Sequence, residues 1–173
     1  MKYLVVVSTV FGLVAAAPAG AAPGDKATAQ MKDQGGKTVG TIALIETPLG
    51  ILLTGDLTQL PPGPHGFHVH AVGRCEPPFT SAGGHFNPNN RKHGFHDSAG
   101  PHAGDLANVH ASVDGKAVVD TFAAGLTLSG GPRGLLDQDG TSLVIHAKVD
   151  DYKSDPAGDS GDRIICGVLG KAP

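Results

Sequence analysis

Six of the nine histidines in this 173-residue chain fall in a pattern that suits metal binding. Imidazole is the commonest metal ligand in proteins, and an acid, Asp105, follows one of these histidines by three residues. The six are His68, His70, His85, His93, His102 and His146. The pattern indicates two sites, one rich in imidazole and one that combines imidazole with carboxylate.

Local structure can assemble only part of this set. His68 and His70 are two residues apart, so on a strand both side chains leave the same face of the sheet. His102 and Asp105 are close enough for one turn to present both. His146 is far away in sequence, and only the tertiary fold can bring it to the others.

Short strands are the elements predicted to position these residues. The chain has 26 Gly, 13 Pro and no Trp, which favours strands joined by many turns over a helical bundle. Neither an internal repeat nor a long helical period is present. Eight strands are predicted, at residues 27–31, 39–46, 50–57, 66–72, 108–113, 117–122, 143–149 and 164–169. They indicate an all-β antiparallel sandwich or barrel.

The segment 73–106 has no apolar period and is dominated by Gly, Pro, Asn and His. So long an irregular stretch is either disordered or a functional loop. We expect metal ligands and Cys75 to supply the order that a core would otherwise supply. Two further loops are predicted, at 59–64, which contains three prolines, and at 150–162.

The N-terminus is predicted to be a cleaved secretory signal. Lys2 gives a positive start, residues 3–17 are mostly apolar, and residues 19–21 read Ala-Gly-Ala, an A-x-A cleavage site. Residues 1–21 are therefore expected to be the signal peptide, and 22–173 an exported domain, periplasmic or secreted. The alternative is a membrane anchor, but spanning needs about twenty apolar residues, and this run is shorter.

The charge balance excludes some partners. The formal net charge is −3, and removal of Lys2 leaves 12 basic against 16 acidic side chains. No broad basic face is available to attract nucleic acid or anionic lipid. We expect neither as a partner, and no membrane span after signal cleavage.

The chain has two cysteines, Cys75 and Cys166. In an exported protein, two cysteines favour one disulfide, and the alternative is two free buried thiols. A bridge would close a loop of about ninety residues, which is worth roughly 4 kcal/mol in the chain-entropy model.

Four segments carry a family resemblance. They are 66–70 (Gly-Phe-His-Val-His), 84–88 (Gly-His-Phe-Asn-Pro), 104–106 (Gly-Asp-Leu) and 161–168 (Gly-Asp-Arg-Ile-Ile-Cys-Gly-Val). They resemble the signature segments of copper/zinc superoxide dismutase, in order and over essentially the whole mature chain. The spacer between Cys75 and His85 is longer than in the eukaryotic enzymes and resembles the bacterial exported type. The resemblance implies a Greek-key arrangement of the eight strands, with long metal-binding and electrostatic loops.

The resemblance also implies how the ligands divide between two metals. It assigns copper to His68, His70, His85 and His146. It assigns zinc to His85, His93, His102 and Asp105. His85 would then serve both ions as an imidazolate. Four imidazoles suit Cu(II), and three imidazoles with one carboxylate suit tetrahedral zinc.

Further roles follow from the same resemblance. Asp150 would hydrogen-bond one copper-ligand and one zinc-ligand histidine, although the adjacent Asp151 could compete for this place. Arg163 would guide the superoxide anion, and the alternative is an ordinary surface arginine. Lys148 and Lys153 are further candidates for steering. His65 is expected to support the backbone, and His96 and His110 to lie outside the metal sites.

The resemblance implies an enzyme that dismutates superoxide to dioxygen and hydrogen peroxide, with Arg163 and His85 acting in catalysis. A rival is an exported copper or zinc buffer, or a chaperone-like domain on the same fold, because fold alone does not give function. Such a domain usually loses a copper ligand or the arginine, and this chain keeps both. A homodimer is compatible with the family, but no interface is carried over from it.

Overall fold

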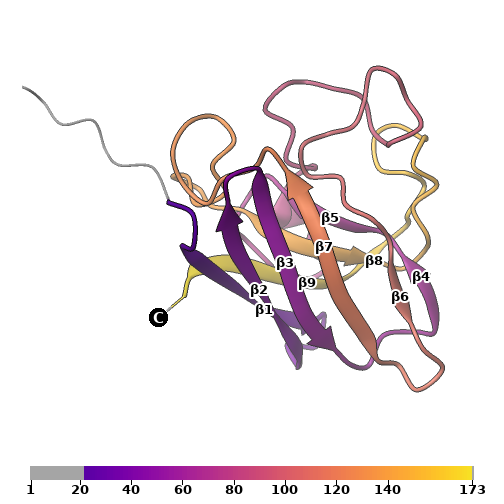
Figure 1. Ribbon diagram of the computed structural model, residues 1–173. Helices are drawn as coiled ribbons and strands as arrows, with labels where there is room; N and C mark the ends of the chain where they lie inside the picture. The colour runs from indigo at the N-terminus through magenta and orange to yellow at the C-terminus, as the bar shows by residue number, and fades with distance from the viewer. Residues whose placement is uncertain (1–21, 173) are drawn as a thin grey trace, which may run out of the picture.

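The computed structural model describes residues 22–172, and the predicted signal peptide, residues 1–21, lies outside this range. The described chain is built almost entirely of strands joined by turns and long loops (Figure 1). The predicted all-β fold is confirmed. No helix among residues 22–172 is long and apolar enough to cross a membrane.

Nine strands and one short 3-10 turn make up the fold. They are β1 (Lys26–Asp33), β2 (Thr38–Thr47), β3 (Gly50–Leu57), β4 (Gly63–His65), β5 (Phe67–His70), η1 (Thr80–Ala82), β6 (Val109–Ala111), β7 (Ala117–Ala124), β8 (Ser142–His146) and β9 (Arg163–Lys171). Seven strands form one antiparallel sheet in the order β5-β8-β9-β1-β2-β3-β7, and β4 pairs with β6 in a second sheet. The large sheet curls into a half-barrel that carries the long loops beyond its strand ends (Figure 1).

The structure corrects four strand predictions. The strands expected over 66–72 and 108–113 are shorter, at Phe67–His70 and Val109–Ala111. Residues 59–64 were expected to be loop throughout, yet β4 begins at Gly63 and includes Pro64. Proline is tolerated in this strand because β4 pairs on one side only, with β6, and needs no amide hydrogen bond on the other. The strand expected over 143–149 ends at His146, where the pairing of β8 with β9 shifts register.

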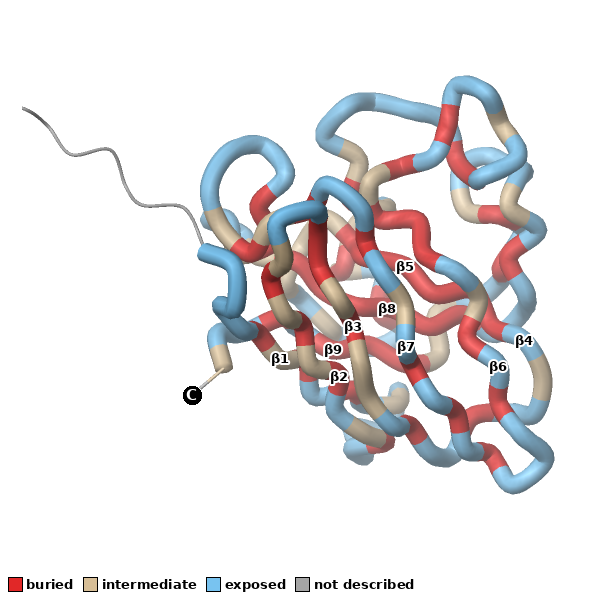
Figure 2. The backbone as a smooth tube through the Cα atoms, in the orientation of Figure 1, coloured by how far each residue is buried: buried red, intermediate tan, exposed pale blue. Residues whose placement is uncertain are grey.

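The core lies inside the half-barrel. Residues of β1, β2 and β7 alternate between buried and more exposed positions, as strands with one solvent-facing side do (Figure 2). Every residue of β5 and β8 is buried, so both faces of these two strands are covered. One face of both strands packs on the main core. On the other face, Val144 of β8 belongs to a smaller cluster with Phe79 and Cys166, and β5 presents His68 and His70.

Candidate metal centre

The structure brings all seven predicted ligands into two groups that share one residue. In each group the ligand atoms lie within 4.8 Å of one another. The first group is His68, His70, His85 and His146, and the second is His85, His93, His102 and Asp105. The rings of His68 and His85 have their centroids 4.0 Å apart.

The first group presents four nitrogens without a protein partner. Among the described residues, five buried side-chain nitrogen or oxygen atoms lack a hydrogen bond, and one of these is Ser160 Oγ. The other four are His68 Nδ1, His70 Nε2, His85 Nε2 and His146 Nε2. Burying a polar atom without a partner is costly, so four such atoms facing one another indicate that an ion belongs there.

In three of these four rings, the second ring nitrogen donates a hydrogen bond to an oxygen acceptor. His68 Nε2 donates to Asp150 Oδ2 at 2.7 Å. His70 Nδ1 and His146 Nδ1 each donate to a backbone carbonyl at 3.0 Å, that of Gly83 and Gly161 respectively. A proton held on one ring nitrogen leaves the lone pair on the other, so these bonds select the tautomer that a metal needs.

The second group is organised around one carboxylate oxygen. Asp105 Oδ1 lies 2.8 Å from His85 Nδ1, 3.1 Å from His93 Nδ1 and 3.3 Å from His102 Nδ1. Its other oxygen accepts the backbone N–H groups of Gly94 and His102. The predicted turn therefore does present His102 and Asp105 together. Three imidazoles and a carboxylate with no open side match a structural zinc site.

His85 takes part in both groups through different atoms. Its Nδ1 faces Asp105 in the mixed group, whereas its Nε2 is one of the four unpartnered nitrogens of the imidazole group. Isolated backbone bridges place this residue beside β5, pairing His70 with His85 and His68 with Asp105. One ring thus lies between two candidate ion positions.

Asp150 connects the two groups, because it is hydrogen-bonded to one histidine of each. Its Oδ1 lies 3.0 Å from His93 Nε2, and its Oδ2 accepts from His68. Asp150 is buried, whereas the competing candidate Asp151 is exposed and bonds Ser154 and the backbone of Lys153. The structure therefore gives the linking position to Asp150.

Sequence reasoning missed the residues that hold Asp150 in place. The Asn108 side chain donates to the Asp150 carbonyl and accepts from its backbone N–H, both at 2.9 Å. Tyr152 donates its backbone N–H to Asp150 Oδ1 at 2.6 Å, and its hydroxyl accepts the backbone N–H of Asn108 at 2.8 Å. No local signal in the sequence could pair Asn108 with a residue 42 positions away.

One glycine is required by the same arrangement. Gly158 has φ +64°, and a Cβ on it would overlap Asp150 Oδ1 and come within 2.7 Å of His93 Nε2. Any side chain at this position would therefore displace the carboxylate that links the two groups.

Arg163 lies at the imidazole group. It pairs with His146 across the β8–β9 ladder. Its guanidinium donates to the carbonyls of Phe79 and Gly83, each at 2.7 Å. The Gly83 carbonyl also accepts from His70 Nδ1, so one backbone oxygen connects the arginine to a candidate ligand. Burial lowers the pKa of Arg163, but the side chain remains only partly buried.

A disulfide fixes the loop whose Phe79 and Gly83 carbonyls bind Arg163. Cys75 and Cys166 are bonded, with their Cα atoms 5.7 Å apart and a separation of 91 positions in sequence. The bridge joins the segment after β5 to β9, three residues beyond Arg163. The predicted pairing is thus present, and the described chain has no free cysteine.

The other three histidines lie outside both groups. His65 is buried, and its ring contacts the carbonyls of His146 at 2.8 Å and Pro61 at 2.7 Å. His96 and His110 are exposed. His65 therefore ties backbone segments together, as predicted.

Burial and neighbouring charges shift the histidine pKa values in opposite directions. Burial, reinforced by the nearby His68, lowers the pKa of His146 to about 3. Burial also outweighs the Asp105 hydrogen bond and lowers the pKa of His85 to about 4. For His93 the effect of burial is overcome by hydrogen bonds to Asp105 and Asp150, and its pKa rises to about 9. The pKa of Asp105 itself lies far below its usual range, because histidine hydrogen bonds outweigh burial.

We expect the metal-free protein to lose stability on both sides of about pH 6.5, the ordinary histidine pKa. Below pH 6.5, histidines of the unfolded chain bind protons, whereas buried His85 and His146 of the folded chain bind them only near pH 4 and pH 3. Acid therefore favours unfolding. Above pH 6.5, the stability that His93 contributes through its raised pKa is lost as the pH passes about 9.

Denaturant unfolding of chelator-treated protein from pH 4 to 9.5 measures both effects. His93→Gln should remove most of the alkaline decline and leave the acid decline in place. Constant stability between pH 4 and 6.5 would contradict the burial of neutral histidines.

Comparison with known proteins agrees with this architecture. A family model described as copper/zinc superoxide dismutase (SODC) matches residues 38–169. Copper–zinc superoxide dismutase 1 of Aquifex aeolicus is 45% identical over 147 residues, covering 83% of this chain and 87% of the relative. The corresponding enzyme of Caulobacter vibrioides is 40% identical over 147 residues, covering 83% and 84%. The crystal structure of a SOD-like protein from Bacillus subtilis has a TM-score of 0.78 and 41% identity, covering 82% of this chain and 96% of that chain.

The structure is thus an antiparallel β protein with two candidate metal-binding groups that share one histidine. The chain belongs to the copper/zinc superoxide dismutase family, a family of oxidoreductases whose cofactors are copper and zinc. The donor sets of this chain fit those cofactors, because the imidazole group and the mixed group offer the ligands that copper and zinc prefer.

Proposed function

We propose that this protein dismutates superoxide, converting two superoxide anions and two protons into one dioxygen and one hydrogen peroxide. The observation that carries the proposal is the position of His85, whose two ring nitrogens face two different ligand groups. A redox metal beside a structural metal, joined by one ring, is the arrangement that this family uses.

The ligand assignment is part of the proposal. Copper would be held by His68, His70, His85 and His146, and zinc by His85, His93, His102 and Asp105. Copper held there would supply one-electron redox chemistry, whereas zinc is redox-inert. The support for this division is the chemistry of the two donor sets.

The chain's own residues would bind the substrate and hold a proton. Arg163 keeps guanidinium N–H groups free beyond the two that bond Phe79 and Gly83, and these can receive an anion next to His70. His85 Nε2 is buried and has no protein partner, so while it is not bound to copper it would hold a proton for the departing peroxide. The zinc ligands would keep the His85 ring oriented and order the loop that carries it.

A rival is an exported metal buffer on the same fold, and one relative, 42% identical, is named a superoxide dismutase-like protein. Loading the purified protein with copper and zinc and measuring superoxide loss separates the two. We expect rapid turnover that disappears when copper is omitted. Full metal content without turnover would favour the buffer and overturn the enzyme assignment.

Export is proposed on the predicted signal, residues 1–21, and is supported by the disulfide, since such bonds persist in oxidising compartments. Mass spectrometry of the protein recovered outside the cytoplasm is expected to show a chain that starts at Ala22. A retained N-terminus on a membrane-bound protein would instead indicate the anchor.

A further inference from the structure

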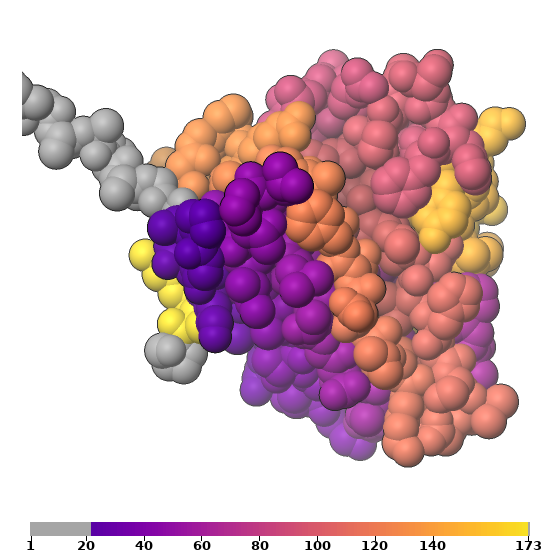
Figure 3. Space-filling view, viewed as in Figure 1, coloured from indigo at the N-terminus to yellow at the C-terminus, as the bar shows by residue number. Residues whose placement is uncertain are grey.

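A groove behind the mixed ligand group has no part in the proposed reaction. It lies between the end of β7 and the loop 89–107, encloses about 590 Å³ and is also lined by Arg133. Volumes of this size accommodate small organic molecules. On the viewed face of the molecule, β7 (orange) lies beside the loop 89–107 (pink), which forms the other side of the groove (Figure 3).

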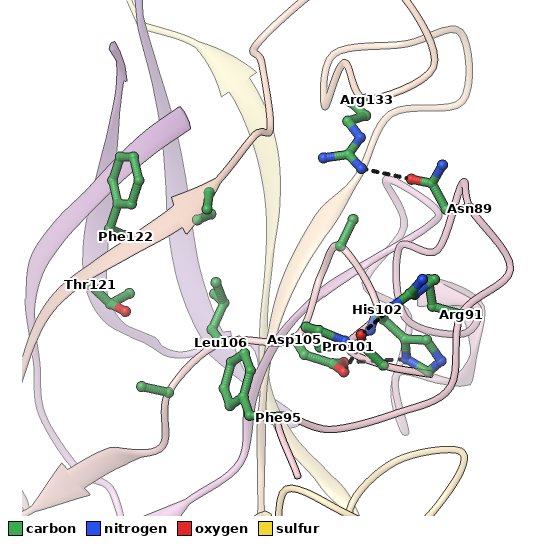
Figure 4. Close-up of a pocket in the computed structure, with 15 residues that line it drawn as sticks. Asn89, Arg91, Phe95, Pro101, His102, Asp105, Leu106, Thr121, Phe122 and Arg133 are labelled. Carbon is green, nitrogen blue, oxygen red and sulfur yellow. Dashed lines mark hydrogen bonds and ion pairs between the residues drawn. The ribbon is translucent and has the colours of Figure 1, made fainter. Parts of the chain in front are cut away.

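The groove combines apolar surface with two arginines. Phe95 and Phe122 lie on one side, and they are 48% and 45% exposed (Figure 4). Leu106 lies between them as part of the floor (Figure 4). Arg91 and Arg133 lie on the other side (Figure 4). Exposed aromatic rings in a concave site favour an apolar ligand.

Neither arginine is neutralised within the described chain. The ion pairs that lysine and arginine make in residues 22–172 involve Arg74, Lys92 and Lys116. Arg91 instead donates to the Gly100 carbonyl at 2.6 Å, and Arg133 donates to Asn89 Oδ1 at 3.0 Å. Each guanidinium is thus oriented by one neutral acceptor and keeps further N–H groups for a ligand.

Negative charge at the groove is confined to one buried side chain. Asp105 is the single acid in the lining, and it is 5% exposed and engaged by the histidines of the mixed group. The chain as a whole carries a net charge of −3. Two unpaired guanidinium groups therefore form a local positive site on an acidic protein, a site that suits a carboxylate.

We propose that this groove binds a small amphiphilic carboxylate, an anion with an aryl or alkyl body. The carboxylate would bond Arg91 and Arg133, while the apolar body would pack between Phe95 and Phe122. None of these four residues belongs to the ligand groups, which meet the groove only through His102 and Asp105.

Calorimetric titration of the metal-loaded protein with three probes tests the proposal. The probes are 4-phenylbutyrate, its uncharged amide and acetate. We expect 4-phenylbutyrate to bind in the millimolar range, as befits a fragment of this size. The amide should bind about tenfold more weakly because it lacks the charge-assisted hydrogen bonds. Acetate should bind more weakly still, since it lacks the apolar body.

Two variants with matched controls locate the site. Arg133→Gln should reduce 4-phenylbutyrate binding to the level of the amide and leave amide binding unchanged, whereas Arg74→Gln, an exposed arginine elsewhere, should change neither. Phe122→Ser should weaken both probes, whereas Val118→Ser, on the same face of β7 but outside the groove lining, should not.

Two results would overturn the proposal. One is equal binding of the carboxylate and the amide, or no binding of either. The other is an Arg74→Gln effect as large as that of Arg133→Gln. Superoxide turnover, measured on the same samples, reports separately on the proposed function, because the variants leave its residues intact.

Discussion

Replacing Arg163 with isoleucine is expected to slow superoxide dismutation by about 10- to 100-fold and to flatten its dependence on salt. Superoxide is an anion, and a chain with a formal net charge of −3 repels it on average. Electrostatic steering, of which superoxide dismutase is itself a known example, needs a local positive region to overcome that repulsion. Arg163 supplies one beside the imidazole group.

The contacts of Arg163 explain why a charge at this position is effective. Two carbonyls hold its guanidinium in one orientation, and its positive field already lowers the pKa of His70 and His146, although less than burial does. The charge is partly buried, so solvent screens it less than it screens an exposed arginine. Removing it should cost both the attraction of the anion and its final orientation.

Rates measured from about 0.01 to 0.3 M ionic strength test this role, since the Debye length falls from about 30 Å to less than 10 Å over that range. Arg163→Lys should retain much of the salt dependence, and Arg74→Ile, which removes an exposed positive charge, should retain most of the rate. Copper content must match the parent protein in each variant. An Arg163→Ile protein with full copper and an unchanged rate would remove the steering role.

The sequence predicted which histidines lie together better than it predicted the orientation of their rings. Spacing alone put His68 and His70 on one strand face, and a turn joined His102 to Asp105, because these relations depend on local geometry. Which ring nitrogen faces an ion depends instead on acceptors that come from elsewhere, such as the Gly83 carbonyl. No local rule contains that information.

The supporting residues show the same limit. Asn108 fixes Asp150 through two backbone bonds, and Gly158 makes room for its carboxylate. In the sequence, Asn108 looks like the first residue of a strand and Gly158 like an ordinary loop residue. Pro64 led to a loop prediction at a position that is in fact an edge strand. Strand pairing over long separations decides these features, and single-sequence periodicity does not report it.

Replacing Asp150 with asparagine is expected to weaken zinc binding about 10- to 100-fold, with a smaller effect on copper. The carboxylate accepts from His68 on one oxygen and from His93 on the other. An amide has only one acceptor oxygen, so one of the two histidines must lose its partner or change its tautomer.

The loss should fall mainly on zinc because the copper group has other supports. His70 and His146 keep their own backbone acceptors, and copper stands above zinc in the divalent affinity series. Chelator competition, with metal content measured for each ion, gives the two affinities. Asp151→Asn is the matched control, since this neighbouring acid is exposed and bonds only its own loop. Unchanged zinc affinity in Asp150→Asn, or an equal loss in Asp151→Asn, would show that the buried carboxylate does not hold His93, the proposed zinc ligand, in its binding orientation.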